Sequence, residues 1–221
     1  MKKAIVLVSG GVDSAVTLYI AKKDYQTHAL IFDYGQKAFK EIECAKRIAS
    51  SAGVPFQVLK ISLPWKGSAL LDAGKPVPEG AAKRSGEIPE TYVPARNIIF
   101  LSFAVSFAEA TGASAVFIGA HQLDFSNYPD CRSAFFERFR ETVRAGTKKG
   151  SEGEEVRIIT PVIDKTKKEI IEMGEELAVP FEYTWSCYKG GKSPCGACES
   201  CLFRTEAFRE AGLEDPLEEV V

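Results

Sequence analysis

The chain has 221 residues, of which 45% are hydrophobic and 26% charged, a composition typical of one well-packed globular domain with at most a small appendage. Its 28 lysines and arginines nearly balance its 30 aspartates and glutamates, so we expect neither nucleic acid nor an anionic membrane as a partner. No apolar stretch approaches the roughly 20 residues that a membrane helix needs, and glycines follow the first apolar run at once, so we predict a first strand rather than an export signal, in a cytoplasmic protein.

Short apolar runs alternate along the chain with longer amphipathic segments, the pattern of parallel strands joined by crossover helices. The runs rich in Val, Ile, Phe and Leu predict strands over 3–8, 27–32, 56–61, 115–119 and 157–160. The segments between them predict helices over 14–23, 37–52, 97–111, 133–145 and 166–177. Thr166 and Glu169 give the last helix a capping box. We therefore predict an α/β fold, a doubly wound, mainly parallel, Rossmann-like sheet of about five strands whose carboxyl ends share one edge.

A long proline-rich segment interrupts this rhythm. Residues 64–95 hold five prolines and four glycines with no sustained hydrophobic period. Structureless loops beyond about 12 to 15 residues are uncommon in compact domains and tend to be lids or binding loops. We predict a lid or binding loop within a catalytic domain of residues 1–180, with an inert insertion as the alternative. Residues 147–155 predict a solvated surface excursion.

The sequence Ser-Gly-Gly-Val-Asp-Ser, at residues 9–14, lies where the first strand leads into the first helix. Adjacent glycines let the backbone approach an anion closely, and a helix N-terminus offers free N–H groups at the positive end of its dipole. The segment matches neither a Walker A loop nor a G-x-G-x-x-G fingerprint. It predicts a phosphate cradle with hydroxyl donors from Ser9 and Ser14. The alternative is a Gly-Gly turn in which Asp13 or Ser14 caps the helix.

This motif resembles the signature of the PP-loop ATP pyrophosphatases, which cleave ATP to AMP and pyrophosphate. The resemblance implies an adenine nucleotide alpha hydrolase-like fold and a set of residues that hold the pyrophosphate and its Mg²⁺: Val8, Ser9, Gly10, Gly11, Val12, Asp13 and Ser14. Arg96 and Lys165, which follow proline-marked chain ends, are candidate basic partners for the phosphates. Asp33 and Tyr34 follow the second strand, where an adenosine could lie, an ordinary turn being the alternative.

Four of the six cysteines crowd together near the C-terminus in the pattern C-x7-C-x2-C-x2-C: Cys187, Cys195, Cys198 and Cys201. Tetrahedral zinc needs four soft ligands about 2.3 Å away, and a C-x2-C turn presents two sulfurs to one point. We predict one structural zinc ion per chain that ties down a small C-terminal segment, residues 181–221. A 4Fe–4S cluster, a disulfide or free thiols are the alternatives.

Three further motifs narrow the resemblance. Residues 92–97 read Tyr-Val-Pro-Ala-Arg-Asn, residues 128–132 read Tyr-Pro-Asp-Cys-Arg, and residues 185–188 read Trp-Ser-Cys-Tyr ahead of the other cysteines. Together with the phosphate loop they resemble the 7-cyano-7-deazaguanine synthases of queuosine biosynthesis over nearly the whole chain. One departure is Ala95, where we expect the family to favour glycine; alanine is a mild change there unless the position needs a positive φ.

The resemblance implies an ATP-dependent carbon–nitrogen ligase that converts 7-carboxy-7-deazaguanine and ammonia into a nitrile. The carboxylate would attack the α-phosphorus of ATP, and ammonia would displace AMP to leave an amide. A second adenylation, on the amide oxygen, would then lead to the cyano group. ATP with Mg²⁺ is a co-substrate, ammonia comes from solution or from a partner, and a homodimer is implied.

The Tyr-Pro-Asp-Cys-Arg motif and the loop before it supply the candidate substrate contacts: Asp124, Tyr128, Asp130, Cys131 and Arg132. We expect the two aspartates to read N–H donors of the guanine-like ring or to bind metal, and Arg132 to hold the carboxylate with its forked guanidinium. Loop salt bridges or caps are the alternatives, and for Cys131 the alternatives are a site-lining thiol and a covalent nucleophile. The predicted catalytic set is Asp13, Arg96, Asp130, Arg132 and Lys165.

Two other functions compete with this interpretation. A PP-loop tRNA thiolase would also adenylate a base but would then deliver sulfur. The near-neutral charge and the lack of an obvious RNA-binding appendage count against it. The other is a non-enzymatic nucleotide-sensing or zinc-stabilised interaction module, which would show no ammonia-dependent consumption of ATP.

Overall fold

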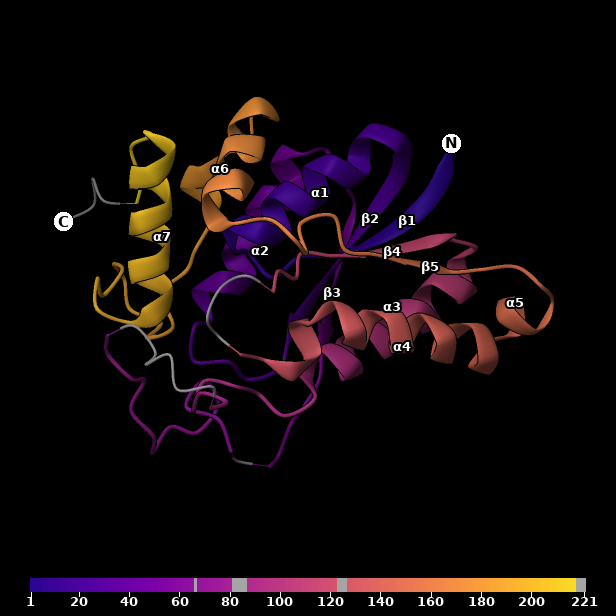
Figure 1. The fold of residues 1–221 in the computed structure, drawn as a ribbon, viewed down its shortest axis with the longest axis horizontal. Helices are drawn as coiled ribbons and strands as arrows, with labels where there is room; N and C mark the ends of the chain where they lie inside the picture. Colours follow the sequence, from indigo (N-terminus) through magenta and orange to yellow (C-terminus); the bar gives the residue numbers. More distant parts are fainter. Residues whose placement is uncertain (66, 81–86, 123–126, 218–221) are drawn as a thin grey trace.

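The computed structural model describes residues 1–65, 67–80, 87–122 and 127–217. Its centre is a five-stranded, all-parallel sheet in the order β3-β2-β1-β4-β5 (Figure 1). The strands are β1 (Lys2–Leu7), β2 (Tyr25–Asp33), β3 (Phe56–Lys60), β4 (Ala115–Ile118) and β5 (Arg157–Ile159). All five predicted strands are confirmed, with ends shifted by one or two residues.

The chain changes its direction of travel across the sheet at β1. It first moves outward from β1 through β2 to β3, and then returns to the other side of β1 for β4 and β5. Leu7, the last residue of β1, pairs with Leu30 of β2 and with Ile118 of β4. In open α/β sheets, ligands bind outside the carboxyl ends of the strands at such a reversal. The topology therefore places the ligand site at the end of β1.

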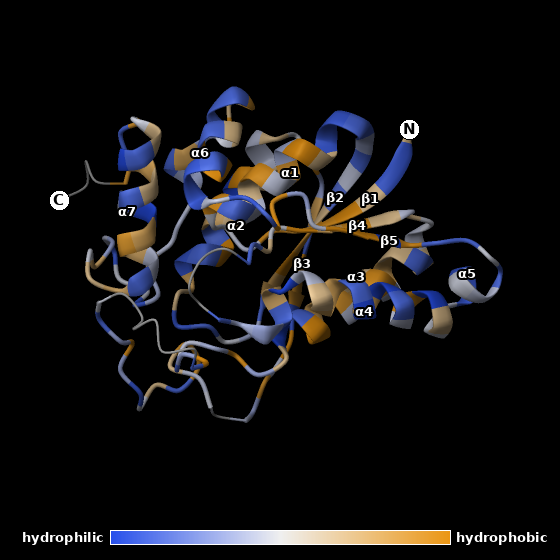
Figure 2. Ribbon diagram, in the orientation of Figure 1, coloured by the Kyte–Doolittle hydropathy of each residue, from blue (hydrophilic) through white to orange (hydrophobic). Residues whose placement is uncertain are grey.

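Helices cover both faces of the sheet, as predicted for a doubly wound fold (Figure 1). One face carries α1 (Val12–Asp24), α2 (Lys40–Ser51) and α6 (Lys167–Glu176), and the other carries α3 (Arg96–Thr111) and α4 (Ser133–Gly146). Val6 packs in the first layer, whereas Ile5 and Leu7 pack in the second, because successive strand residues point to opposite faces. Burial on both faces explains the nearly continuous hydrophobic strands at the centre of Figure 2.

The predicted capping box of α6 is confirmed. Thr166 Oγ1 accepts a hydrogen bond from the Glu169 N–H at 3.2 Å, and Glu169 Oε2 accepts one from the Thr166 N–H at 2.8 Å. Within the segment expected to be a solvated excursion, the structure has a one-turn helix, α5 (Lys148–Ser151), capped by Thr147. Two short 3-10 turns lie at Pro129–Cys131 and Phe181–Tyr183.

A C-terminal helix, α7 (Glu199–Ala211), was not predicted. It packs on α6, but its buried side also holds the charged residues Glu199 and Arg204, which interrupt the apolar stripe. Arg204 Nε and Nη2 donate to the two carboxylate oxygens of Asp215 at 2.7 and 2.8 Å. The two hydrogen bonds to Asp215 compensate for burying the charge of Arg204. A helix with a buried charge of this kind is not predicted from hydrophobic periodicity. None of the described helices is long and apolar enough to cross a membrane.

The described residues of the segment 64–95 form neither helix nor strand, apart from one isolated bridge between Glu79 and Cys198. Ser68 and Ala69 are fully buried, so part of the segment is packed into the fold. The bridge places it against the cysteine-rich C-terminal part. Its action as a lid and the boundary at residue 180 remain predictions.

Candidate active site

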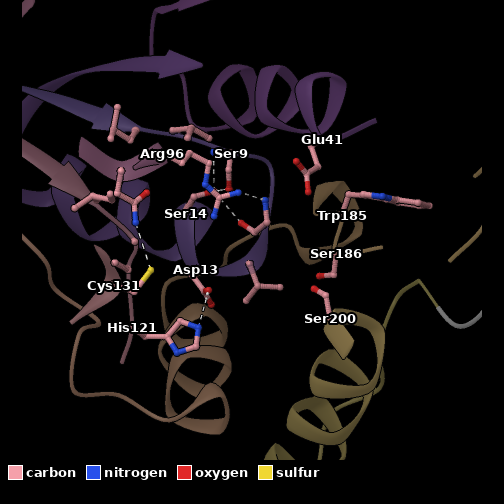
Figure 3. A pocket seen from close by; sticks show the side chains of 18 of the residues that line it. Ser9, Asp13, Ser14, Glu41, Arg96, His121, Cys131, Trp185, Ser186 and Ser200 are labelled. Atoms are coloured by element: carbon pink, nitrogen blue, oxygen red, sulfur yellow. Dashed lines mark hydrogen bonds and ion pairs between the residues drawn. The ribbon is translucent and has the colours of Figure 1, made fainter. Parts of the chain in front are cut away.

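A cavity of about 280 Å³ lies at the carboxyl ends of β1, β2 and β4 (Figure 3). One wall is apolar and includes Phe32 and Phe100, whose rings stack with centroids 4.0 Å apart and planes 2° apart. The polar lining includes Ser9, Gly11, Asp13, Ser14, Tyr34, Glu41, Arg96, Asn97, His121, Tyr128, Cys131, Lys167, Ser186, Tyr188, Glu199 and Ser200. A flat apolar wall beside convergent polar groups suits a purine nucleotide.

The phosphate loop is shaped by a close approach between Gly10 and α2. Gly10 has φ +93°, and a Cβ added to it would lie 2.2 Å from the carbonyl oxygen of Glu41, so only glycine fits. The cap residue of α1 is Gly11, with no side-chain cap hydrogen bond, and Ser14 Oγ donates back to the Gly11 carbonyl oxygen at 3.0 Å. Neither Asp13 nor Ser14 therefore acts as the N-cap. The first turn of α1 lines the cavity, and the N–H groups of a first helical turn have no partner within the helix, so this turn suits an anion cradle.

Asp13 meets two basic side chains at the start of α1. Its Oδ2 accepts a hydrogen bond from Lys167 Nζ at 2.5 Å. The same oxygen lies 3.3 Å from His121 Nε2 (Figure 3). Burial raises the pKa of Asp13, but Lys167 and His121 outweigh burial and hold the pKa well below its usual range. Its Oδ1 is buried and has no hydrogen-bond partner among the described residues. An ionised carboxylate with a spare oxygen beside a phosphate cradle fits a Mg²⁺ ligand.

The lysine at the phosphate loop is Lys167, not the predicted Lys165. Lys165 Nζ pairs with Glu169 Oε1 at 3.2 Å, both side chains are 42% exposed, and Lys165 does not line the cavity. The capping residue Thr166 separates the two lysines, so Lys165 lies outside the helix while the first turn of α6 directs Lys167 towards α1. Sequence spacing alone does not reveal this difference in direction.

Arg96 is the first residue of α3 and lines the cavity, as predicted. Its Nη1 donates a long hydrogen bond of 3.4 Å to the Tyr34 hydroxyl. Burial lowers the pKa of Arg96, but Tyr34 and Tyr128 more than offset burial, so the pKa is raised and the guanidinium stays charged. Ala95, just before it, has φ 56°. The position where we expected glycine thus does adopt the left-handed region.

Asn97 links α3 to the Tyr-Pro-Asp-Cys-Arg segment. The Asn97 backbone N–H donates to Asp130 Oδ2 at 3.0 Å, and its Nδ2 donates to the Asp130 carbonyl oxygen at 2.9 Å and to Cys131 Sγ at 3.3 Å. Asp130 is 5% exposed and does not line the cavity, so its carboxylate holds the start of α3. Burial, with the charge of Asp130, raises the pKa of Cys131 to about 11. A thiol that stays protonated at neutral pH is a poor nucleophile, which favours the site-lining interpretation of Cys131.

Three other predicted residues lie apart from the cavity or outside the description. Arg132 is exposed, and its Nη2 donates to Asn127 Oδ1 at 3.2 Å. Asp33 ends β2 and does not line the cavity, although Tyr34 beside it does. Asp124 lies outside the described residues. Neighbouring residues at strand ends and in irregular loops point in different directions, so a motif places its segment near the cavity without placing every side chain in it.

The C-terminal part closes the cavity in a way that the sequence did not reveal. The backbone N–H of Trp185 donates to the Gly10 carbonyl oxygen at 2.8 Å. This hydrogen bond joins the C-terminal part of the chain to the phosphate loop. Ser186 and Ser200 then face the cavity opposite Asp13 (Figure 3). The sequence signal for this closure is the Trp-Ser-Cys-Tyr motif, which lies directly before the other clustered cysteines.

The four clustered cysteines converge as a metal centre requires. Their Sγ atoms lie within 4.8 Å of one another, and around a tetrahedral zinc ion sulfurs are about 3.8 Å apart. The backbone N–H groups of Cys195 and Cys198 point at the Sγ atoms of Cys187 and Cys195, at 3.4 and 3.3 Å, and such bonds stabilise thiolates. Four cysteines fill a tetrahedral shell and leave no open position for a substrate. Cys198 and Cys201 flank the first turn of α7, so a bound metal would fix the helix that carries Ser200.

A family model described as queuosine biosynthesis protein QueC matches residues 3–212. The chain belongs to this family. Proteins named 7-cyano-7-deazaguanine synthase are similar over nearly their whole length. The one from Trichodesmium erythraeum is 48% identical over 97% of this chain and 99% of its own. The one from Thermosynechococcus vestitus is 50% identical over 98% and 95%, and the one from Clostridium kluyveri is 48% identical over 98% and 97%.

The QueC family match spans the phosphate loop, the cavity lining and all four clustered cysteines. It confirms the resemblance inferred from the sequence motifs and does not favour the tRNA thiolase alternative. Among solved structures, NMN synthetase from Francisella tularensis is similar with a TM-score of 0.48 at 15% identity, over 99% of this chain and 81% of that one. The fold assignment rests on the sheet order and helix layers of this chain.

Proposed function

We propose that this chain is a nitrile-forming, ATP-dependent carbon–nitrogen ligase that converts 7-carboxy-7-deazaguanine and ammonia into 7-cyano-7-deazaguanine. The observation that carries the proposal is the phosphate cradle at the reversal point of the sheet, with Asp13, Lys167 and Arg96 lining one cavity. Its full-length similarity to proteins named 7-cyano-7-deazaguanine synthase supplies the substrate class.

The residues of this chain would act mainly by positioning and charge neutralisation. The N–H groups at the start of α1 would hold the pyrophosphate of ATP, and Lys167 would turn from Asp13 towards it. Asp13, with its buried spare oxygen, would hold Mg²⁺, which supplies charge neutralisation on the phosphates. Arg96 would meet the substrate carboxylate, or the charge that develops at the α-phosphate.

One cavity can serve both halves of the reaction. In the first, a carboxylate oxygen attacks the α-phosphorus, and in the second an amide oxygen does so. Each time the leaving group is pyrophosphate, and AMP then departs from the same carbon. The residues that line the cavity would only have to hold the two oxygen nucleophiles, one after the other, at the same position beside the α-phosphorus.

The remaining assignments belong to the same proposal. The four cysteines would hold zinc as a structural ion, and removal of the ion would loosen α7 rather than abolish a chemical step. Asp130 would act as a positioning residue through Asn97. Roles for Asp33, Asp124 and Arg132 in binding, and a homodimer, remain proposals from the resemblance.

Product analysis tests the proposal. The zinc-loaded protein is incubated with ATP, Mg²⁺, ammonium and 7-carboxy-7-deazaguanine, and the products are followed by mass spectrometry. We expect AMP and the nitrile to appear together, and neither to accumulate without the acid. Release of ADP, or consumption of ATP without any change in the acid, would refute the proposed reaction. Iron and sulfide analysis of the same sample separates zinc from an iron–sulfur cluster.

A further inference from the structure

The proposed reaction requires the removal of four protons from the ammonium nitrogen, and the residues that hold ATP and Mg²⁺ do not provide for it. Nitrogen enters as ammonium with four hydrogens and leaves in a nitrile with none. Ammonium loses one proton to become nucleophilic ammonia and a second when the amide forms. The amide loses its remaining two when AMP departs and the C≡N bond is complete. The cavity therefore needs a group that attracts a small cation and accepts protons from nitrogen.

Three carboxylates line the cavity: Asp13, Glu41 and Glu199. Asp13 is engaged by Lys167 and His121, which keep it a weak base. Glu199 is only 7% exposed and directly follows Cys198 of the metal centre. Glu41 is half-buried, and in the described part of the chain no hydrogen bond or ion pair reaches its carboxylate. Glu41 is thus the carboxylate of this set whose oxygens are left to the cavity.

The backbone fixes Glu41 beside the phosphate loop. Its carbonyl oxygen is the atom that a Cβ on Gly10 would strike at 2.2 Å. Its side chain points into the space also faced by Ser186 and Ser200, which come from the C-terminal part (Figure 3). The Glu41 carboxylate therefore lines the same cavity as the phosphate loop, in which the acyl adenylate would form.

We propose that Glu41 binds ammonium in the cavity and accepts its proton, so that ammonia is released next to the adenylated substrate. The ammonium N–H bond breaks, its electron pair remains on nitrogen, and the proton passes to a Glu41 oxygen. Ammonia then attacks the carbonyl carbon and AMP leaves. Glu41 returns the proton to solvent through the cavity and accepts the later N–H protons in turn. This inference rests on the proposed function.

The charges around Glu41 suit that role. Burial raises its pKa to about 7, with the positive charge of Arg96 opposing burial and the negative charge at Cys187 adding to it. Tyr34 and Tyr188, which also face this space, have raised pKa values, so they stay protonated. A base whose pKa is near the working pH is the most effective proton acceptor. Because the pKa is raised, the basic form of Glu41 gains population as the pH rises through about 7.

The test uses Glu41→Gln in the zinc-loaded protein and two nucleophiles. Hydroxylamine is uncharged at neutral pH, so it captures an acyl adenylate as a hydroxamate without first giving up a proton. Exchange between pyrophosphate and ATP, dependent on the acid substrate, measures adenylation alone. Glu43→Gln, an exposed carboxylate on the same helix, is the matched control, and zinc content with thermal melting checks the fold of both variants.

We expect Glu41→Gln to keep exchange and hydroxamate formation within about threefold while ammonium-dependent amide formation falls about 100-fold. Glu43→Gln should leave all three rates unchanged. A parallel loss of exchange would mean that Glu41 binds Mg²⁺ or the ring, and an equal loss with both nucleophiles would mean a structural role. Either result, or full ammonium-dependent activity, would overturn the inference. Absence of exchange in the unaltered protein would instead overturn the proposed function.

Discussion

At the scale of single residues, the pair formed by Lys167 and Asp13 gives a direct prediction. Replacing Lys167 with Met removes the cation at the phosphate loop and should lower acid-dependent ATP–pyrophosphate exchange about 100-fold, the cost of one preorganised charge in a site of this kind. Lys165→Met is the matched control, because Lys165 pairs with Glu169 away from the cavity, and should change the rate less than twofold. The opposite ranking of the two variants would contradict the placement of Lys167.

Ala95 gives a second prediction, for stability. Its φ of 56° puts an L side chain in the left-handed region, at a cost of roughly 1 kcal/mol. Ala95→Gly should therefore raise the free energy of unfolding by about 0.5–1 kcal/mol in urea titrations of the zinc-loaded protein. Ala110→Gly, in the regular backbone of α3, should lower it instead. A loss of stability in Ala95→Gly would show that the backbone strain at this position is absent.

Among the structural elements, the strands were the most predictable part of the fold. The run Ala4-Ile5-Val6-Leu7-Val8 is buried on both faces of the sheet. Such a continuous hydrophobic run predicts a buried parallel strand from the local sequence alone. The helix α7 was not predicted because the charged residues Glu199 and Arg204 lie on its buried side, where Arg204 pairs with Asp215. The pairing of Arg204 with Asp215 depends on the folded structure, so the sequence pattern of α7 alone does not reveal it.

The metal centre and α7 together give a prediction about an element. Removing a metal held by the four cysteines should release the first turn of α7, which contains Cys201 and follows Cys198. The sheet should stay folded, because its two apolar layers are formed mainly by the strands and by helices other than α7. Hydrogen exchange should then speed up for amides of α7 and stay slow for those of β1, and ATP should bind more weakly because Ser200 lines the cavity. Unchanged protection of α7 after metal removal would contradict this account.

For the whole molecule, sequence motifs predicted which segments form the site, but only the three-dimensional structure shows which side chains line the cavity. The phosphate loop, Arg96, Tyr128 and Cys131 were predicted from local motifs and all line the cavity. Glu41 belonged to no interpreted motif, and it reaches the cavity because α2 packs against Gly10. The strand order that gathers these segments around β1 depends on long-range pairing, which hydrophobic periodicity does not encode.

The most direct test of the central claim, that one cavity adenylates two successive oxygen nucleophiles, is to count AMP per nitrile from two starting points. The zinc-loaded protein receives either 7-carboxy-7-deazaguanine with ammonium or the corresponding amide without it. We expect about two AMP per nitrile from the acid and about one from the amide, and we expect Lys167→Met to slow both reactions alike. One AMP per nitrile from the acid, or an amide that is not converted, would contradict it.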